Sequence, residues 1–159
     1  MIILGIDPGT RVTGYGIVKK TSEGVSHIDH GELRPPRNSP LPAALKEVFE
    51  SLMEIVELHS PDAIVIENIF YGKNVKSLIK QGHLRGVAML AAPLNGLPVY
   101  EYSPLEIKQA VVGYGRAEKH QVQQMVTVLL RLPSPPPPDA SDALAMAICH
   151  AHSMRKEQA

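Results

Sequence analysis

The sequence predicts an α/β domain with a five-stranded mixed sheet that is flanked by helices on both faces. Three observations support this fold class. Three strand-like segments come first, helix-like and strand-like segments then alternate, and the last third of the chain is mostly helical. Strands joined through helices are expected to be parallel, with right-handed crossovers. We expect residues 1–152 to form a single α/β domain and residues 153–159 to be a short polar tail.

The first three strands are expected to form an antiparallel meander. Residues 2–7 are an almost uninterrupted hydrophobic run, which indicates a buried strand. An Asp-Pro-Gly-Thr-Arg turn then leads to a second strand at 14–20. The loosely alternating segment 25–33 predicts the third strand.

A helix and a fourth strand follow the meander. Residues 34–42 hold four prolines and are expected to form a loop. Apolar residues then recur at helical spacing over 41–56, and a Ser-Pro-Asp sequence at 60–62 ends that helix. The continuous apolar run at 63–67 predicts a strand that is buried on both faces of the sheet.

The rest of the chain is expected to be mostly helical. Ser103 and Glu106 have the spacing of a capping box, and Pro104 suits the first helical position, so a helix is expected to begin there. The expected elements are a long helix at 74–94, a short fifth strand at 98–102, a helix to about 112, a helix over 117–132, a stiff proline connector at 133–138 and a last helix from 139 past 149.

Composition and charge limit the possible functions. The chain has 16 basic and 16 acidic residues, and zero net charge counts against a nucleic-acid-binding protein. The charge distribution counts the other way, because residues 68–100 contain lysines and an arginine but no acid. We find no signal peptide and no apolar run of membrane-spanning length, and the single cysteine, Cys149, fits a reducing compartment. We therefore expect a soluble cytoplasmic protein without membrane contact.

Four carboxylates are the strongest functional signal in the sequence. Asp7 ends the first strand, Glu67 ends the fourth, and Asp139 and Asp142 open the last helix. Acids seldom occupy core elements unless cations neutralise them, and all-oxygen ligand sets suit Mg²⁺ or Mn²⁺ rather than zinc. On adjacent central strands the first two acids would lie side by side, and the last helix can pack across them. The sequence therefore predicts a two-metal phosphodiester hydrolase.

Each acid also has an ordinary structural explanation. Asp7 could cap an Asp-Pro-Gly turn, and Glu67 could point from a strand end into solvent. Asp139 and Asp142 could be ordinary helix-start residues. The combination favours the metal site, because Asp139 and Asp142 share one helical face and the glycines after Asp7 leave space for a phosphate.

Candidate DNA contacts occur mainly after Glu67. Two adjacent aromatic residues could stack on bases, and lysines on one face of the helix at 74–94 could contact phosphates. The alternatives are aromatic residues buried in the core and an ordinary solvated helix face. The candidate DNA-binding residues are Phe70, Tyr71, Lys73, Lys76, Lys80, Lys108 and Lys119, and His83 and Arg116 are further candidates.

Four motifs together resemble a known family. Gly-Ile-Asp-Pro-Gly-Thr-Arg-Val-Thr-Gly-Tyr-Gly at 5–16, Ile-Glu-Asn-Ile-Phe at 66–70, Gly-His-Leu-Arg-Gly-Val-Ala at 82–88 and Asp-Ala-Ser-Asp-Ala-Leu-Ala at 139–145 resemble the bacterial RuvC family of crossover junction endonucleases. The resemblance implies a ribonuclease H-like fold and a homodimer. It also implies Mg²⁺-dependent resolution of four-way Holliday junctions by paired nicks in opposed strands.

The resemblance further implies roles for single residues and for partners. It makes the four carboxylates the catalytic acids, and it makes Phe70 the aromatic residue that opens the junction. Some members of the family have histidine where this chain has Asp139. Lys108 and Lys119 match basic DNA contacts of the family. The branch-migration proteins RuvA and RuvB are implied as partners.

Three other functions stay open from the sequence. An actin-like ATPase or sugar kinase shares the Asp-Xaa-Gly-Thr element, but it needs a second phosphate loop and a second domain for which 159 residues leave no room. Another ribonuclease H-like nuclease would cut RNA–DNA hybrids. A non-catalytic junction-binding module would be opposed by four carboxylates, because uncompensated carboxylates repel DNA.

Overall fold

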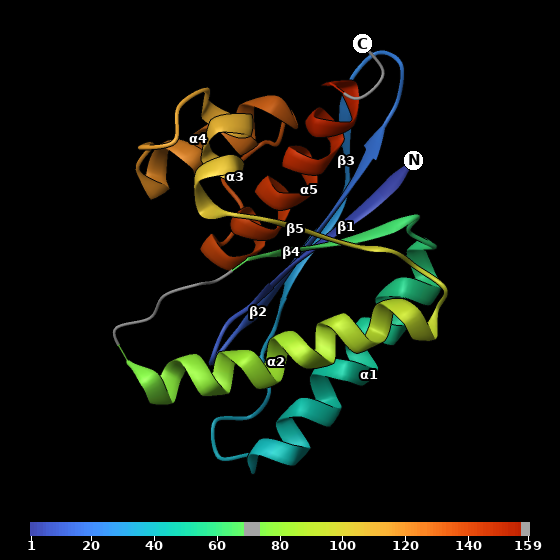
Figure 1. Ribbon diagram of the computed structural model, residues 1–159, viewed down its shortest axis with the longest axis vertical. Helices are drawn as coiled ribbons and strands as arrows, with labels where there is room; N and C mark the ends of the chain where they lie inside the picture. The colour runs from blue at the N-terminus through green and yellow to red at the C-terminus, as the bar shows by residue number, and fades with distance from the viewer. Residues whose placement is uncertain (69–73, 157–159) are drawn as a thin grey trace.

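A five-stranded sheet forms the centre of the computed structural model, which describes residues 1–68 and 74–156, with side chains through residue 154. The strand order is β3-β2-β1-β4-β5, and the sheet separates two layers of helices (Figure 1). The strands are β1 (Ile2–Pro8), β2 (Thr13–Lys20), β3 (Val25–Leu33), β4 (Ala63–Glu67) and β5 (Val99–Tyr102).

The strand pairing confirms the predicted mixed sheet. β1 pairs antiparallel with β2, and β2 pairs antiparallel with β3, which gives the meander. β4 is parallel to β1, and β5 is parallel to β4. Ile6 lies opposite Ile66 in the β1–β4 register. The next residue of each strand is an acid, so Asp7 and Glu67 lie side by side at the carboxyl ends of the two central strands.

Helices cover both faces of the sheet, which explains the uninterrupted apolar runs of β1 and β4. Leu4 and Ile66 belong to the core beneath α1 and α2, whereas Ile3 and Val65 belong to the core beneath α3, α4 and α5. Among the described residues, no helix combines the length and apolarity that a membrane crossing requires. The helices are α1 (Leu41–His59), α2 (Val75–Leu94), α3 (Pro104–Val112), α4 (Lys119–Leu129) and α5 (Pro138–Lys156), arranged as Figure 1 shows.

Two helix boundaries differ from the prediction. α5 continues to Lys156, so part of the predicted polar tail is helical. The Ser153 hydroxyl donates to the carbonyl of Cys149 at 2.9 Å, which satisfies a polar side chain within the helix. α4 is shorter than the predicted span 117–132, and Arg131 just beyond it has a φ of 52°, which turns the chain out of the helical path.

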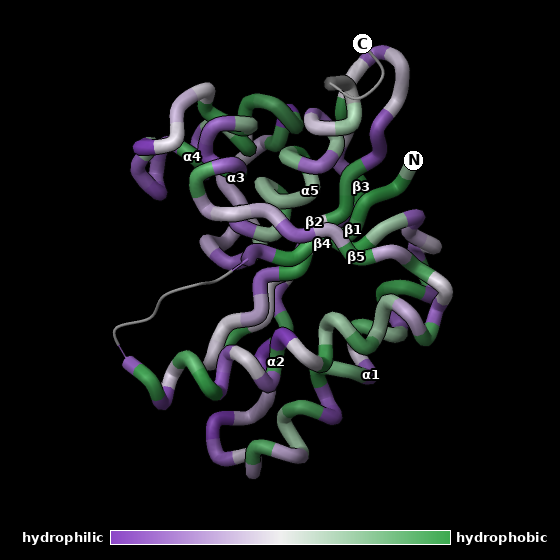
Figure 2. The backbone as a smooth tube through the Cα atoms, viewed as in Figure 1, coloured by the Kyte–Doolittle hydropathy of each residue, from purple (hydrophilic) through white to green (hydrophobic). Residues whose placement is uncertain are grey.

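α2 has two apolar faces, and only one of them packs on the sheet. Figure 2 shows that hydrophobic residues recur along the whole helix. The face against the sheet consists of one leucine and three small residues, namely Leu84, Ala88, Ala91 and Ala92. Four larger apolar residues lie on the opposite side and are 52–67% exposed: Val75, Ile79, Leu90 and Leu94. We call these four residues the exposed α2 stripe.

Candidate active site

Three carboxylates converge where one cation could contact all of them. One oxygen each from Asp7, Asp139 and Asp142 lies within 4.8 Å of the other two. Glu67 stands beside Asp7 at the end of β4, and it shares a cavity wall with Asp142. The structure therefore brings together all four predicted acids, from β1, β4 and α5.

Glycines in β1 and β2 allow α5 to deliver its two acids. A Cβ atom at Gly5 would lie 2.0 Å from the carbonyl oxygen of Ala143, and one at Gly14 would lie 2.1 Å from the carbonyl oxygen of Asp139. No real side chain tolerates such distances. The first turns of α5 thus rest directly on the backbone of the strands, which brings Asp139 and Asp142 beside Asp7.

The acids destabilise one another's charges. Burial, and then the negative charges of the three other acids, raise the pKa of Asp7 to about 7. Burial is also the main reason why the pKa values of Glu67, Asp139 and Asp142 are raised. A cluster of this kind favours either bound protons or bound cations, and a divalent cation matches oxygen donors.

Two lysines stand next to the acids. Lys119 pairs with Asp142 at 3.1 Å, and both line a cavity of about 220 Å³ with Lys108 and Glu67. We call this space the lysine cavity. Partial burial lowers the pKa of Lys119, but its hydrogen bond to Asp142 and the surrounding negative charge raise it overall. Lys119 therefore carries its charge at neutral pH, within reach of anything bound to the acids.

Glu32 is a neighbour of the acids that the sequence did not single out. Its carboxylate pairs with Arg34, and its side chain is only 10% exposed. After burial, the charge of Glu32 is the largest cause of the raised pKa of Asp139. Glu32 lies in the loosely alternating strand β3, where an acid normally indicates a solvent-facing position, so its place beside the acids could not be predicted.

Arg85 has a structural role beside the site. Its guanidinium pairs with Glu101, and its Nε donates to the backbone carbonyl of Glu67 at 3.4 Å. This arginine thus joins α2 to the end of β4 and to β5. The acid-free stretch 68–100 is therefore less positive on its surface than the count of its cations implies.

The remaining predicted DNA contacts that the structure describes lie on α2 and just before α4. Lys76, Lys80 and His83 are exposed on α2, and Arg116 is exposed before α4. Their side chains are therefore accessible to a phosphate. The predicted contacts Phe70, Tyr71 and Lys73 lie outside the described residues.

Comparison with known proteins decides the family. The family model described as crossover junction endodeoxyribonuclease RuvC matches residues 3–150. The chain belongs to the RuvC family. A RuvC of Geotalea uraniireducens is 51% identical over 153 residues, which cover 96% of this chain and 90% of that relative.

Solved RuvC structures have the same fold. The structure of Thermus thermophilus RuvC matches with a TM-score of 0.90 and 30% identity, and the match covers 99% of this chain and 97% of that one. T. thermophilus RuvC in complex with a Holliday junction substrate matches with a TM-score of 0.89 and 28% identity, over 98% and 96% of the two chains. The predicted family and its ribonuclease H-like sheet are therefore confirmed. The Asp-Pro-Gly-Thr element belongs to a RuvC strand and turn rather than to a kinase or ATPase.

Proposed function

We propose that this RuvC-family chain is a metal-dependent endonuclease that resolves four-way DNA junctions in recombination and repair. It nicks opposed strands in symmetric pairs. The observation that carries this proposal is the convergence of the carboxylates of β1, β4 and α5 at one place. The Thermus relative that shares this fold was solved with a Holliday junction substrate, which supports the choice of DNA.

The donor set fits two Mg²⁺ ions, and Mn²⁺ can substitute for Mg²⁺ in such a set. All four side chains offer only carboxylate oxygens, and burial together with the neighbouring acids raises the pKa of Asp7 to about 7, so a bound cation would favour its charged form. Asp7, Glu67, Asp139 and Asp142 would hold the ions. When bound, the ions supply Lewis-acid stabilisation to the attacking water and to the leaving 3′ oxygen, so the products end in 5′-phosphate and 3′-hydroxyl.

Basic and aromatic residues bind and orient the strand that is cut. Lys108 and Lys119 border the acids in the lysine cavity, so their ammonium groups can contact phosphate oxygens next to the cut. Lys76 and Lys80 are exposed on α2 and suit contacts to a duplex arm. Phe70, Tyr71 and Lys73 complete this set as proposed base-stacking and phosphate-binding residues.

The exposed α2 stripe supports a homodimer. Large apolar residues on one side of a helix are rarely left in water. Gly82 and Gly86 lie on the same side, and a Cβ at either position would meet nothing within 4 Å in this chain. Two small residues one turn apart allow a second helix to come close. A two-fold dimer also matches the need for two equivalent cuts.

The cellular setting follows from the substrate. Junctions form in bacterial DNA, so the proposed place of action is the cytoplasm. RuvA and RuvB, which move the branch point in the family's pathway, are the proposed protein partners. This chain would meet RuvA and RuvB because all of them act at the same DNA junction. We assign no residue described above to a contact with either protein.

The deciding experiment compares two substrates under two metal conditions. Wild-type protein and Asp7→Asn are incubated with a four-way DNA junction and with an RNA–DNA hybrid, in Mg²⁺ or in EDTA. We expect paired nicks in the junction by the wild type in Mg²⁺ only, and junction binding without cutting by Asp7→Asn. Preferred cleavage of the hybrid would favour the rival nuclease. Binding without any cleavage by the wild type would favour a binding module.

A further inference from the structure

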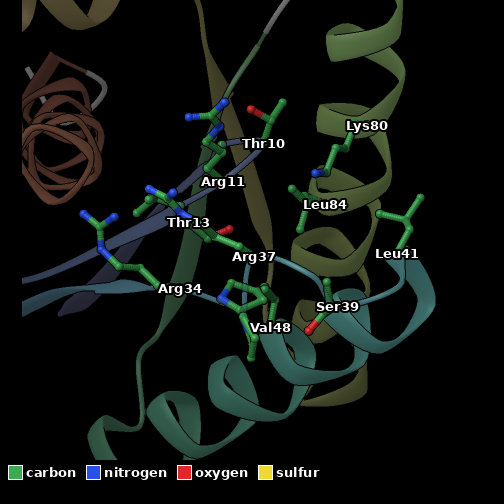
Figure 3. A pocket seen from close by; sticks show the side chains of 15 residues that line it. Thr10, Arg11, Thr13, Arg34, Arg37, Ser39, Leu41, Val48, Lys80 and Leu84 are labelled. Atoms are coloured by element: carbon green, nitrogen blue, oxygen red, sulfur yellow. The ribbon is translucent and has the colours of Figure 1, made fainter.

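A second and larger cavity lies on the other side of the acids. It measures about 480 Å³ and is formed by the β1–β2 turn, the loop from β3 to α1, and helices α1 and α2. Three arginines, Arg11, Arg34 and Arg37, line it from the strand and loop side. Figure 3 shows Lys80 extending from α2 toward these arginines. We call this space the arginine cavity.

The charge of the arginine cavity is one-sided. Its described lining contains four cations and no acid. Arg34 pairs with Glu32, whereas Arg11, Arg37 and Lys80 form no ion pair with any other described residue. Because the whole chain has zero net charge, this concentration of positive charge is local. Such a site attracts an anion, and arginine forks suit phosphate oxygens.

One buried polar group in the cavity wall lacks a partner. Thr13 is 2% exposed, and its hydroxyl has no hydrogen-bond partner among the described residues. Buried hydroxyls are normally satisfied, so an absent acceptor or donor is expected here. Thr10 and Ser39 add two more hydroxyls to the same lining. The wall thus offers neutral hydrogen-bonding groups as well as charge.

The floor of the arginine cavity is apolar. Val48 and Leu84 are buried there, and Leu41 adds to the same surface. Volume and floor together exceed what a bare phosphate ion needs. An apolar floor beneath a cationic rim fits a sugar with its attached phosphate.

The cavity opens next to the acids. Gly9 belongs to its lining, and a Cβ at Gly9 would lie 3.9 Å from Oδ1 of Asp139. Arg34 reaches the same neighbourhood through Glu32. The acids therefore lie between two basic spaces, the arginine cavity and the lysine cavity. A strand that passes over the acids has a cationic site on each side.

We propose that the arginine cavity binds a backbone phosphate and its sugar on the DNA strand being cut, on the opposite side of the cut from the lysine cavity. Arg11, Arg37 and Lys80 bind the phosphate, and Arg34 is held in place by Glu32. The proposal rests on the proposed junction-cutting function, and it adds three arginines that the sequence did not single out, Arg11, Arg34 and Arg37. Holding the strand on both sides fixes the scissile phosphate over the acids.

The test uses the double variant Arg11→Gln/Arg37→Gln with Arg131→Gln as control. Arg131 is an exposed arginine beyond α4, away from both cavities. Single-turnover nicking of a four-way junction is measured against protein concentration at several salt concentrations. We expect the half-saturating concentration of the double variant to rise roughly tenfold and its salt slope to fall by about one to two, one per lost phosphate contact. The melting temperature should stay near that of the wild type, and the control should match the wild type throughout.

A junction with one neutral methylphosphonate identifies the phosphate. The methylphosphonate is moved along the cut strand from one position to the next. At one position next to the cut it should weaken junction binding by the wild type, and at that position it should not weaken junction binding by the double variant. Additive losses at every position would overturn the proposal, as would an unchanged salt slope. If millimolar inorganic phosphate raises the melting temperature of the wild type only, and junction affinity is equal in both proteins, the cavity binds a free anion and the DNA assignment is wrong. Failure of the wild type to nick junctions at all would instead refute the proposed function.

Discussion

At the scale of single residues, Asp7 is the group on which the site depends. It is the second-last residue of the central strand β1, it is joined by acids from β4 and α5, and its pKa is raised to about 7. An acid with this pKa destabilises the folded protein wherever it must be charged. A divalent cation bound by the acids would remove this destabilisation.

The pH dependence of stability tests this view of Asp7. The folded-state pKa is about 7 and the ordinary value is 3.8, so the folded protein binds more protons between these values. Stability in EDTA should therefore fall as the pH rises from about 4 to about 7. Asp7→Asn lacks this titration, so it should be more stable than the wild type at pH 8 by something on the order of 2–4 kcal/mol, and by much less at pH 5.

Calorimetry in EDTA and in Mg²⁺ provides the measurement. Mg²⁺ should raise the melting temperature of the wild type at pH 8 and have little effect on Asp7→Asn. Equal melting temperatures for both proteins in EDTA at pH 8 would show that burial and the neighbouring acids do not destabilise the charged form of Asp7.

At the scale of elements, the position of α5 depends on missing side chains in β1 and β2. Gly14 leaves room for the backbone of Asp139, so Gly14→Ala must push the start of the helix away from the sheet. We expect a loss of about 1–3 kcal/mol in the free energy of unfolding. Nicking should fall by more than the loss of folded protein explains, because the two α5 acids move with the helix.

The matched control for this change is Gly82→Ala in α2. A Cβ at Gly82 meets nothing within 4 Å in this chain, and alanine favours helix by up to about 1 kcal/mol. Both variants are compared by chemical denaturation in an Ile79→Glu background, which removes the dimer contact proposed for the Gly82 side of α2. Similar stability of Gly14→Ala and Gly82→Ala would contradict the close packing of α5.

Most elements were predictable because their signals are local. The capping box of Ser103 and Glu106 is present at the start of α3, as the spacing predicts. The apolar runs of β1 and β4 gave both strands and the place of Asp7 and Glu67. The two faces of α2 were not predictable, because the sheet takes the small residues and leaves the exposed α2 stripe outside. Hydrophobicity alone would predict that the larger apolar residues pack on the sheet and that the small residues face outward.

At the scale of the whole molecule, the candidate site was only partly predictable. The four acids could be recognised from the sequence, because a charged residue on a core element indicates that something neutralises its charge. No sequence pattern indicates the arginine cavity, because its four cations come from a turn, a proline-rich loop and a helix and share no regular spacing. These cations are Arg11, Arg34, Arg37 and Lys80. Only the folded sheet places these segments side by side.

The oligomeric state tests the exposed α2 stripe. Ile79→Glu places a charge at the centre of the proposed helix contact, and because Ile79 is 57% exposed the change should leave the fold intact. Val128→Glu is the matched control, since Val128 is 69% exposed on α4. Sedimentation should show a monomer for Ile79→Glu and a dimer for the control. A dimer in both variants would place the interface elsewhere.

Arg85 gives α2 a second consequence in the proposed dimer. Its bond to the carbonyl of Glu67 connects the helix that would meet the other subunit with the last residue of β4. Helix α2 would then mechanically link the pairing of two subunits to the alignment of each cutting centre. Each subunit holds this bond within its own chain, so a shift of α2 at the subunit contact would be transmitted to the end of β4 beside the acids.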